Sequence, residues 1–132
     1  MSAPALQLSS TVLGAPDPRA LAAFYRDLLG GELRVDEPEW VILGLPGEKA
    51  LSFQQEAHHV PPVWPQGPGD QQMQLHLDVE VVVSGEDPAA SLAAAAARAV
   101  ELGGRLAEQQ PQEHVRVVLD PAGHPFCLFV GG

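Results

Sequence analysis

The sequence predicts an α+β fold made of two βαβββ modules, and a short segment that occurs twice is the main evidence. The first copy runs from Asp17-Pro18 to Gly30-Gly31, and the second runs from Asp87-Pro88 to Gly103-Gly104. Each copy places aspartate at the N-cap, proline at the first helical position and glycine after the last turn, which are helix start and stop signals. Strand-like segments follow each predicted helix, as expected for a duplicated unit. Small-molecule sites often lie at the seam of such a duplication.

The first module is expected to contain a helix over residues 18–29. Its large apolar residues recur every three or four positions and form a stripe that can pack on a sheet. They are Leu21, Phe24, Tyr25 and Leu28. The alternation of residues 6–13 predicts the first strand, with one face that carries Leu6, Leu8, Ser10 and Val12. Three further strands are expected over residues 32–36, 40–44 and 50–55.

The second module begins with a regular alternation over residues 73–83, which predicts a strand with one buried and one solvated face. The predicted core face carries Met73, Leu75, Leu77, Val79 and Val81. The solvated face carries Gln74, His76, Asp78 and Glu80. An alanine-rich helix over residues 88–102 follows, and strands are expected over residues 105–108, 114–119 and 125–130.

A proline-rich segment, residues 57–71, separates the two modules, which we place at about 5–56 and 72–131 of a single domain spanning residues 1–132. Prolines stand at 61, 62, 65 and 68 and glycines at 67 and 69, a composition typical of irregular structure. Two interpretations are open. The segment is either a linker between the modules or an ordered flap that holds Trp64 over a pocket.

Composition excludes several classes of function. The chain has 132 residues and a net charge of -10, from 7 basic and 17 acidic residues, which disfavours binding to nucleic acids or anionic membranes. Such a charge could attract a cationic ligand. Cys127 is the single cysteine, so an intramolecular disulfide is excluded. With no recognisable secretory leader and no long apolar stretch, the expected location is the cytoplasm.

Three motifs resemble the vicinal oxygen chelate superfamily, which groups glyoxalases, extradiol dioxygenases, fosfomycin-resistance enzymes and bleomycin-resistance proteins. They are Asp17-Pro18 ahead of the helix ending Asp27-Leu28-Leu29-Gly30, the strand His76-Leu77-Asp78, and Asp120-Pro121-Ala122-Gly123-His124-Pro125-Phe126. The resemblance points to a glyoxalase-like branch. It implies two βαβββ modules that form a curved mixed sheet around a cavity, with the helices on the outer face, and a homodimer.

The resemblance also implies four metal-ligand positions, usually filled by His or Gln, Glu, His and Glu. In this sequence they correspond to Ser10, to Ser52 or Gln54, to His76, and to Cys127. Only His76 is a good ligand for a catalytic cation. We therefore expect no bound metal. If one binds, His76 with Gln54 and Cys127 would hold it.

The side chains expected in the cavity each have a purely structural alternative. His76, beside Asp78, would form hydrogen bonds or transfer protons, or is simply a histidine on a solvated strand. Trp40 and Trp64 would stack on a ligand, or their rings pack within the core or within a loop. Arg116 would bind a carboxylate or lies in solvent, and Cys127 is more readily an inert thiol than a nucleophile.

These observations predict a small-molecule-binding protein that sequesters or senses a ligand without a metal, and the net charge is compatible with a cationic ligand. The alternative is a metal-dependent lyase, isomerase or dioxygenase, so enzymatic activity is left open. The predicted pocket consists of Ser10, Trp40, Ser52, Gln54, Trp64, His76, Asp78, Arg116 and Cys127.

Overall fold

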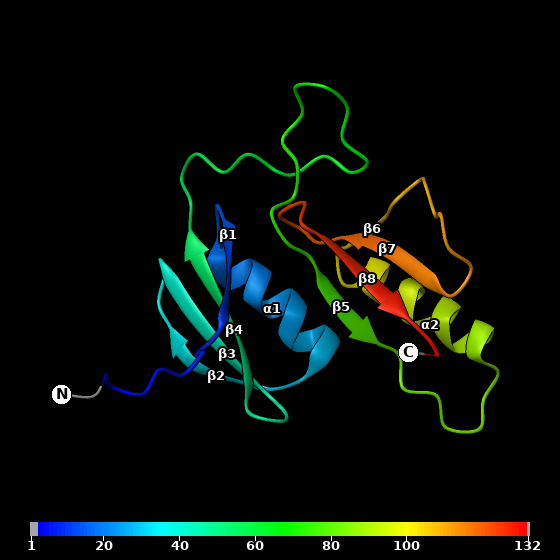
Figure 1. The fold of residues 1–132 in the computed structure, drawn as a ribbon, viewed down its shortest axis with the longest axis horizontal. Helices are drawn as coiled ribbons and strands as arrows, with labels where there is room; N and C mark the ends of the chain where they lie inside the picture. The colour runs from blue at the N-terminus through cyan, green and yellow to red at the C-terminus, as the bar shows by residue number, and fades with distance from the viewer. Residues whose placement is uncertain (1–2, 132) are drawn as a thin grey trace. The chain divides into compact units, whose positions relative to one another are not determined.

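A computed structural model describes residues 3–131 of the chain and contains two compact units that divide between Ala57 and His58. Each unit is one βαβββ module with its own four-stranded mixed sheet and a single helix (Figure 1). The predicted α+β class and duplicated modules are therefore confirmed. Within residues 3–131, no helix is long and apolar enough to cross a membrane.

The first unit contains β1 (Thr11–Ala15), α1 (Pro18–Leu29), β2 (Glu32–Asp36), β3 (Trp40–Leu45) and β4 (Lys49–Gln55). Its strand order is β1-β4-β3-β2. The β1–β4 pair is parallel, whereas β2, β3 and β4 pair in antiparallel fashion. The first and last strands of the module therefore lie side by side.

Helix α1 packs on β1, β3 and β4 and forms the core of the first unit with them. The Asp17 side chain accepts a hydrogen bond from the backbone N–H of Ala20 at 3.2 Å, which confirms the predicted N-cap. Tyr25 is fully buried and its ring stacks on Phe53 of β4, with 5.8 Å between ring centroids. The turn after the helix depends on Gly31, whose φ is +103° and whose place for a Cβ is taken by the carbonyl of Gly44.

The second unit repeats this connectivity. It contains β5 (Leu77–Glu80), α2 (Pro88–Glu101), β6 (Arg105–Leu106), β7 (Val115–Leu119) and β8 (Pro125–Phe129). The strand order is β5-β8-β7-β6, with β5 parallel to β8 and the other pairs antiparallel. Helix α2 packs on β6, β7 and β8 through a narrow stripe of Leu92, Ala96 and Ala99.

Two predicted strands are shorter than their alternation suggested. Leu6 and Leu8 lie outside β1 and are 93% and 92% exposed, and Leu75 lies outside β5 and is 48% exposed. The reason is the neighbouring strand. In the parallel registers, Leu8 would face Glu48 and Leu75 would face His124, which precede β4 and β8. Leu6, Leu8 and Leu75 therefore have no strand backbone beside them to pair with.

Candidate functional site

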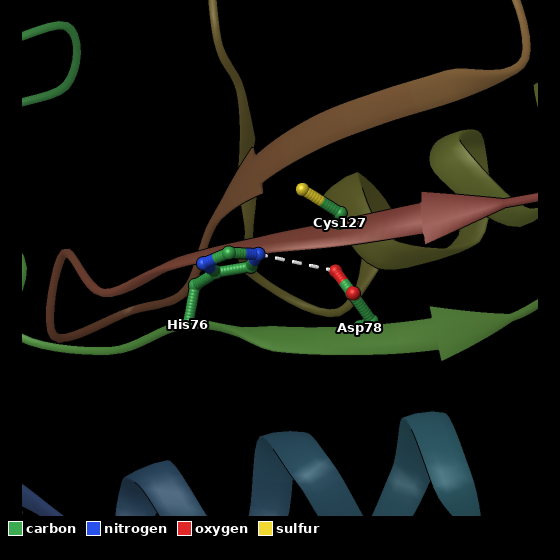
Figure 2. Close-up of side chains that lie close together, drawn as sticks. All are labelled: His76, Asp78 and Cys127. Atoms are coloured by element: carbon green, nitrogen blue, oxygen red, sulfur yellow. Dashed lines mark ion pairs between the residues drawn. The ribbon is translucent and has the colours of Figure 1, made fainter.

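Three chemically reactive side chains meet on the sheet of the second unit. Asp78 of β5 and Cys127 of β8 are directly paired in the parallel register, and His76 stands two residues before Asp78. Strand alternation puts His76 and Asp78 on one face, and Figure 2 shows all three side chains on the same side of the strands. Their ligand atoms all lie within 4.8 Å of one another, and His76 Nε2 is 3.2 Å from Asp78 Oδ1. We call these residues the His-Asp-Cys cluster.

The cluster lies on the face of the sheet that is opposite to α2. Phe126 and Leu128, the neighbours of Cys127 on β8, are 0% and 2% exposed, as expected for side chains packed under the helix. Cys127 alternates with them and is only partly buried. The side chains of His76 and Asp78 are 41% and 65% exposed. The cluster is therefore within reach of solvent and of ligands.

A pocket of about 200 Å³ adjoins this cluster within the second unit. Its wall consists of Trp64, Met73, His76, Pro111, Gln112, Val115, Val117, Pro125 and Cys127. The wall is mainly apolar and contains no lysine or arginine among the residues that the structure describes. Such a lining suits a small, largely apolar molecule that carries no negative charge.

The proline-rich segment contributes Trp64 to this wall and is held in place by the turn between β7 and β8. His59 Nε2 is 2.7 Å from the carbonyl oxygen of Ala122 in that turn. Gly123 has a φ of +90°, and a Cβ added there would meet Cβ of Pro61 at 2.7 Å. The N–H of Val63 donates to the carbonyl of Gln71 at 2.8 Å, which closes the loop around Trp64. The segment is therefore held at the β7–β8 turn and closed on itself around Trp64.

The corresponding positions of the first unit carry different chemistry. In the parallel β1–β4 pair Val12 lies opposite Ser52, just as Asp78 lies opposite Cys127 in the β5–β8 pair. Ser52 therefore corresponds to Cys127. Ser10, two residues before Val12, corresponds to His76. The Ser10 and Ser52 hydroxyls share a hydrogen bond of 2.7 Å, and Ser52 is fully buried. This register selects Ser52 rather than Gln54 as the counterpart of Cys127.

Two other predicted residues of the first unit lie opposite each other. Trp40 of β3 pairs with Gln54 of β4, whose amide nitrogen donates to Glu56 Oε1 at 2.7 Å. Trp40 is half-buried and Gln54 is exposed. Within the first unit, Trp40, Ser52 and Gln54 thus lie on the neighbouring strands β3 and β4, and Ser10 lies just before β1.

Arg116 lies apart from the pocket of the second unit. Its neighbours Val115 and Val117 line that pocket, whereas Arg116 lies beside Ala96 and Val100 of α2 at a separate shallow hollow. The guanidinium donates to the carbonyls of three nearby residues, Gln112, Glu113 and Val115. Its hydrogen bonds in this structure therefore go to the protein's own backbone.

A model of the glyoxalase-like domain family matches residues 10–129, which includes both units and the cluster. The chain belongs to the glyoxalase-like family. Solved structures of a glyoxalase-related enzyme, a fosfomycin resistance protein and a lactoylglutathione lyase have the same fold as this glyoxalase-like chain. A search of curated proteins found no significant match.

Three solved structures illustrate the fold of this glyoxalase-like protein. A glyoxalase-related enzyme from Fulvimarina pelagi is 21% identical, with a TM-score of 0.66 over 95% of this chain and 88% of that one. A lactoylglutathione lyase from Agrobacterium tumefaciens is 21% identical, with a TM-score of 0.59 over 98% and 96%. A variant of the fosfomycin resistance protein FosX from Listeria monocytogenes, in complex with Mn(II), is 14% identical, with a TM-score of 0.66 over 96% and 90%.

The four metal positions that the motif resemblance implies are not filled by a fitting donor set in this glyoxalase-like protein. Ser10 and Ser52 offer neutral hydroxyls that are already hydrogen-bonded to each other. Protein sites for divalent cations are built instead from carboxylate, imidazole, thiolate and carbonyl donors. The residues present therefore do not fit a four-ligand centre. Suitable donors occur in the second unit, where Asp78 joins His76 and Cys127.

Sequence reasoning missed much of the apolar pocket wall. Met73 was expected on the core face of a strand, but it lies before β5 and lines the pocket. Val115 and Val117 were not singled out, although their alternation with Arg116 contained the signal. Once Cys127 is placed on the pocket face, its antiparallel partner Val117 belongs to that face as well.

The Cys127 thiol gives the first testable prediction. Burial raises its pKa above the ordinary value for cysteine, and the nearby Asp78 carboxylate raises it further. We expect the alkylation rate of chelator-treated protein with iodoacetamide to rise at a higher pH than in the urea-unfolded chain. Asp78→Asn should move this midpoint back toward that of the unfolded chain. Peptide mass spectrometry across a pH series measures both rates.

The same shift has a definite sign for stability. The folded protein holds the Cys127 thiol proton more tightly than the unfolded chain does. The resulting contribution to folding stability is therefore fully present below the ordinary thiol pKa, and it is lost as the pH rises through the raised pKa of the folded protein. An alkylation midpoint at or below that of the unfolded chain would contradict this description of Cys127.

Proposed function

We propose that this glyoxalase-like protein binds a small, largely apolar molecule in the pocket of the second unit, and that binding requires no metal. The observation that carries the proposal is the pocket itself, which combines a mainly apolar wall with a few polar groups. His76 and Cys127 supply those groups, and Trp64 supplies a broad aromatic surface. Sequestration or sensing of the ligand needs nothing more than this arrangement.

Charge favours a cationic ligand over an anionic one. Asp78 lies beside two residues of the pocket wall, which itself has no basic residue within the described part of the chain. The whole chain carries a net charge of -10, which attracts cations over a longer range. A cation over the face of Trp64 would gain about 0.5–2 kcal/mol.

The alternative function, a metal-dependent lyase, isomerase or dioxygenase, has less support from the residues. Such chemistry in the superfamily uses donors at four positions. Two of those positions, Ser10 and Ser52, hold hydroxyls that bond each other. Binding without a metal makes no demand on these two residues.

The test compares phenyltrimethylammonium with tert-butylbenzene, its neutral isostere, by calorimetric titration of the full chain in the presence of EDTA. We expect the cation to bind more tightly. Trp64→Ala should weaken its binding by about 2-fold to 30-fold, the equivalent of the lost cation–π energy. Trp64→Phe keeps an aromatic face and should retain most of the affinity. Failure of both probes to bind, or equal affinity of wild type and Trp64→Ala, would overturn the proposal.

A further inference from the structure

We infer that the His-Asp-Cys cluster is a three-donor binding site for a borderline divalent cation of the Zn²⁺ type. The site is local to the second unit and includes Asp78, which corresponds to none of the superfamily's ligand positions. The inference does not rest on the proposed binding function, which concerns the metal-free pocket. It departs from the sequence-based expectation, which was no bound metal. It also replaces Gln54, which that expectation placed with His76 and Cys127 if a metal does bind, with Asp78.

The geometry needs little change to hold an ion. Ligand atoms around a tetrahedral zinc lie roughly 3.5 Å apart, given metal–ligand distances of about 2.0–2.3 Å. The three atoms here already lie within 4.8 Å of one another. Asp78 and His76 have side chains that are 65% and 41% exposed, so both can rotate toward the thiol without disturbing the core. Rotamer changes alone can therefore close the site.

The backbone beneath two of the three donors, Asp78 and Cys127, is fixed by the sheet. Asp78 and Cys127 are partners in the parallel β5–β8 ladder, which sets the distance between their Cα atoms. Cys127 is anchored between Phe126 and Leu128, which are both buried. A pair of ligands on adjacent strands is better positioned than a pair on loops, because the sheet restrains both.

The donor set selects the class of cation. Imidazole and thiolate favour zinc and other borderline or soft cations, whereas Mg²⁺ and Ca²⁺ require mostly oxygen ligands. A bound thiolate and carboxylate would balance the two charges of the ion. Three protein ligands leave a fourth position open, and His76 and Cys127 both line the pocket. That position is thus accessible to water or to a ligand.

The test measures metal binding directly, with no organic probe present. Full-length protein is stripped with chelator, reconstituted with Zn²⁺, desalted and analysed for metal content. We expect one zinc per chain and no retained Mg²⁺ or Ca²⁺. Substitution with Co²⁺ should produce a thiolate-to-cobalt charge-transfer band in the near ultraviolet. Because this band reports a sulfur–metal bond, it distinguishes the cluster from adventitious histidine binding.

Matched variants locate the site. Cys127→Ser should abolish the charge-transfer band, and Asp78→Asn and His76→Asn should each weaken zinc binding by at least about tenfold. Glu80→Gln, two residues further along β5, is the control and should leave affinity unchanged. Circular dichroism confirms that each variant is folded, and the two exposed positions keep the test informative if Cys127→Ser is unstable.

Three results would overturn the inference. They are substoichiometric zinc in the wild-type chain, a Co²⁺ complex without the thiolate band, and zinc affinity that Asp78→Asn leaves unaltered. Failure of the metal site is distinguishable from failure of the proposed function, because phenyltrimethylammonium binding is measured in EDTA.

Discussion

Phe53→Ala is expected to lower the free energy of unfolding by about 3–5 kcal/mol, which is the usual cost of removing a fully buried phenylalanine. Phe53 is 0% exposed on β4, the strand that pairs with both β1 and β3. Its ring also stacks on Tyr25 of α1, so the substitution removes the main aromatic contact between helix and sheet. Urea unfolding followed by circular dichroism measures the change.

Leu8→Ala is the matched control in the same unit. Leu8 is 92% exposed, and truncation of an exposed side chain usually changes stability by less than about 0.5 kcal/mol. The two variants should therefore unfold at clearly different urea concentrations. Equal midpoints would mean that the first unit is not held together by the α1–β4 contact.

Asp120→Ala is expected to cost about 1–3 kcal/mol of stability because it removes the side-chain acceptor of one buried and one part-buried backbone N–H group. Asp120 is 4% exposed, and its Oδ1 accepts hydrogen bonds from the N–H groups of Ala122 at 2.9 Å and His124 at 3.0 Å. This turn also contacts His59 and Pro61 of the segment that holds Trp64. We expect phenyltrimethylammonium affinity to fall together with stability. Thermal unfolding and calorimetric titration measure the two effects.

Asp120→Asn separates the hydrogen bonds from the charge. The amide oxygen can accept both backbone N–H groups, so this variant should lose much less stability than Asp120→Ala. If the two substitutions destabilise the protein equally, the turn depends on the charge of Asp120 and not on its acceptor oxygen.

Local signals explain why much of the fold could be predicted from the sequence. The helix expected over residues 18–29 is found at those residues because its cap, its proline and its apolar stripe all act within one element. The strand expected at residues 32–36 also matches its observed bounds. Duplication of the signals then predicted the second module.

The extent of the outer strands could not be predicted in the same way. Residues 6–8 alternate as a strand would, but strand structure also requires a neighbour at the correct register. That neighbour, β4, is limited by the turn that precedes Lys49. The residue at which β4 begins depends on tertiary structure, so the alternation of Leu6 and Leu8 does not reveal it.

The candidate site was predictable only in part for the same reason. Motif resemblance brought out His76 and Cys127, and alternation placed Asp78 beside His76. The contact between Asp78 and Cys127 depends on a parallel register between strands that are far apart in the sequence. Periodicity within either strand carries no information about that register, so Gln54 was paired with them instead.

The parallel pairing of β5 with β8 also has a consequence for folding. These strands are the first and last of the second unit, with α2, β6 and β7 between them in the chain. Bringing β5 and β8 together closes a long loop, which costs conformational entropy. Contacts with the intervening elements offset this cost only after those elements have formed. We therefore expect the His-Asp-Cys cluster to assemble late, so that a cation bound to it reports a folded second unit.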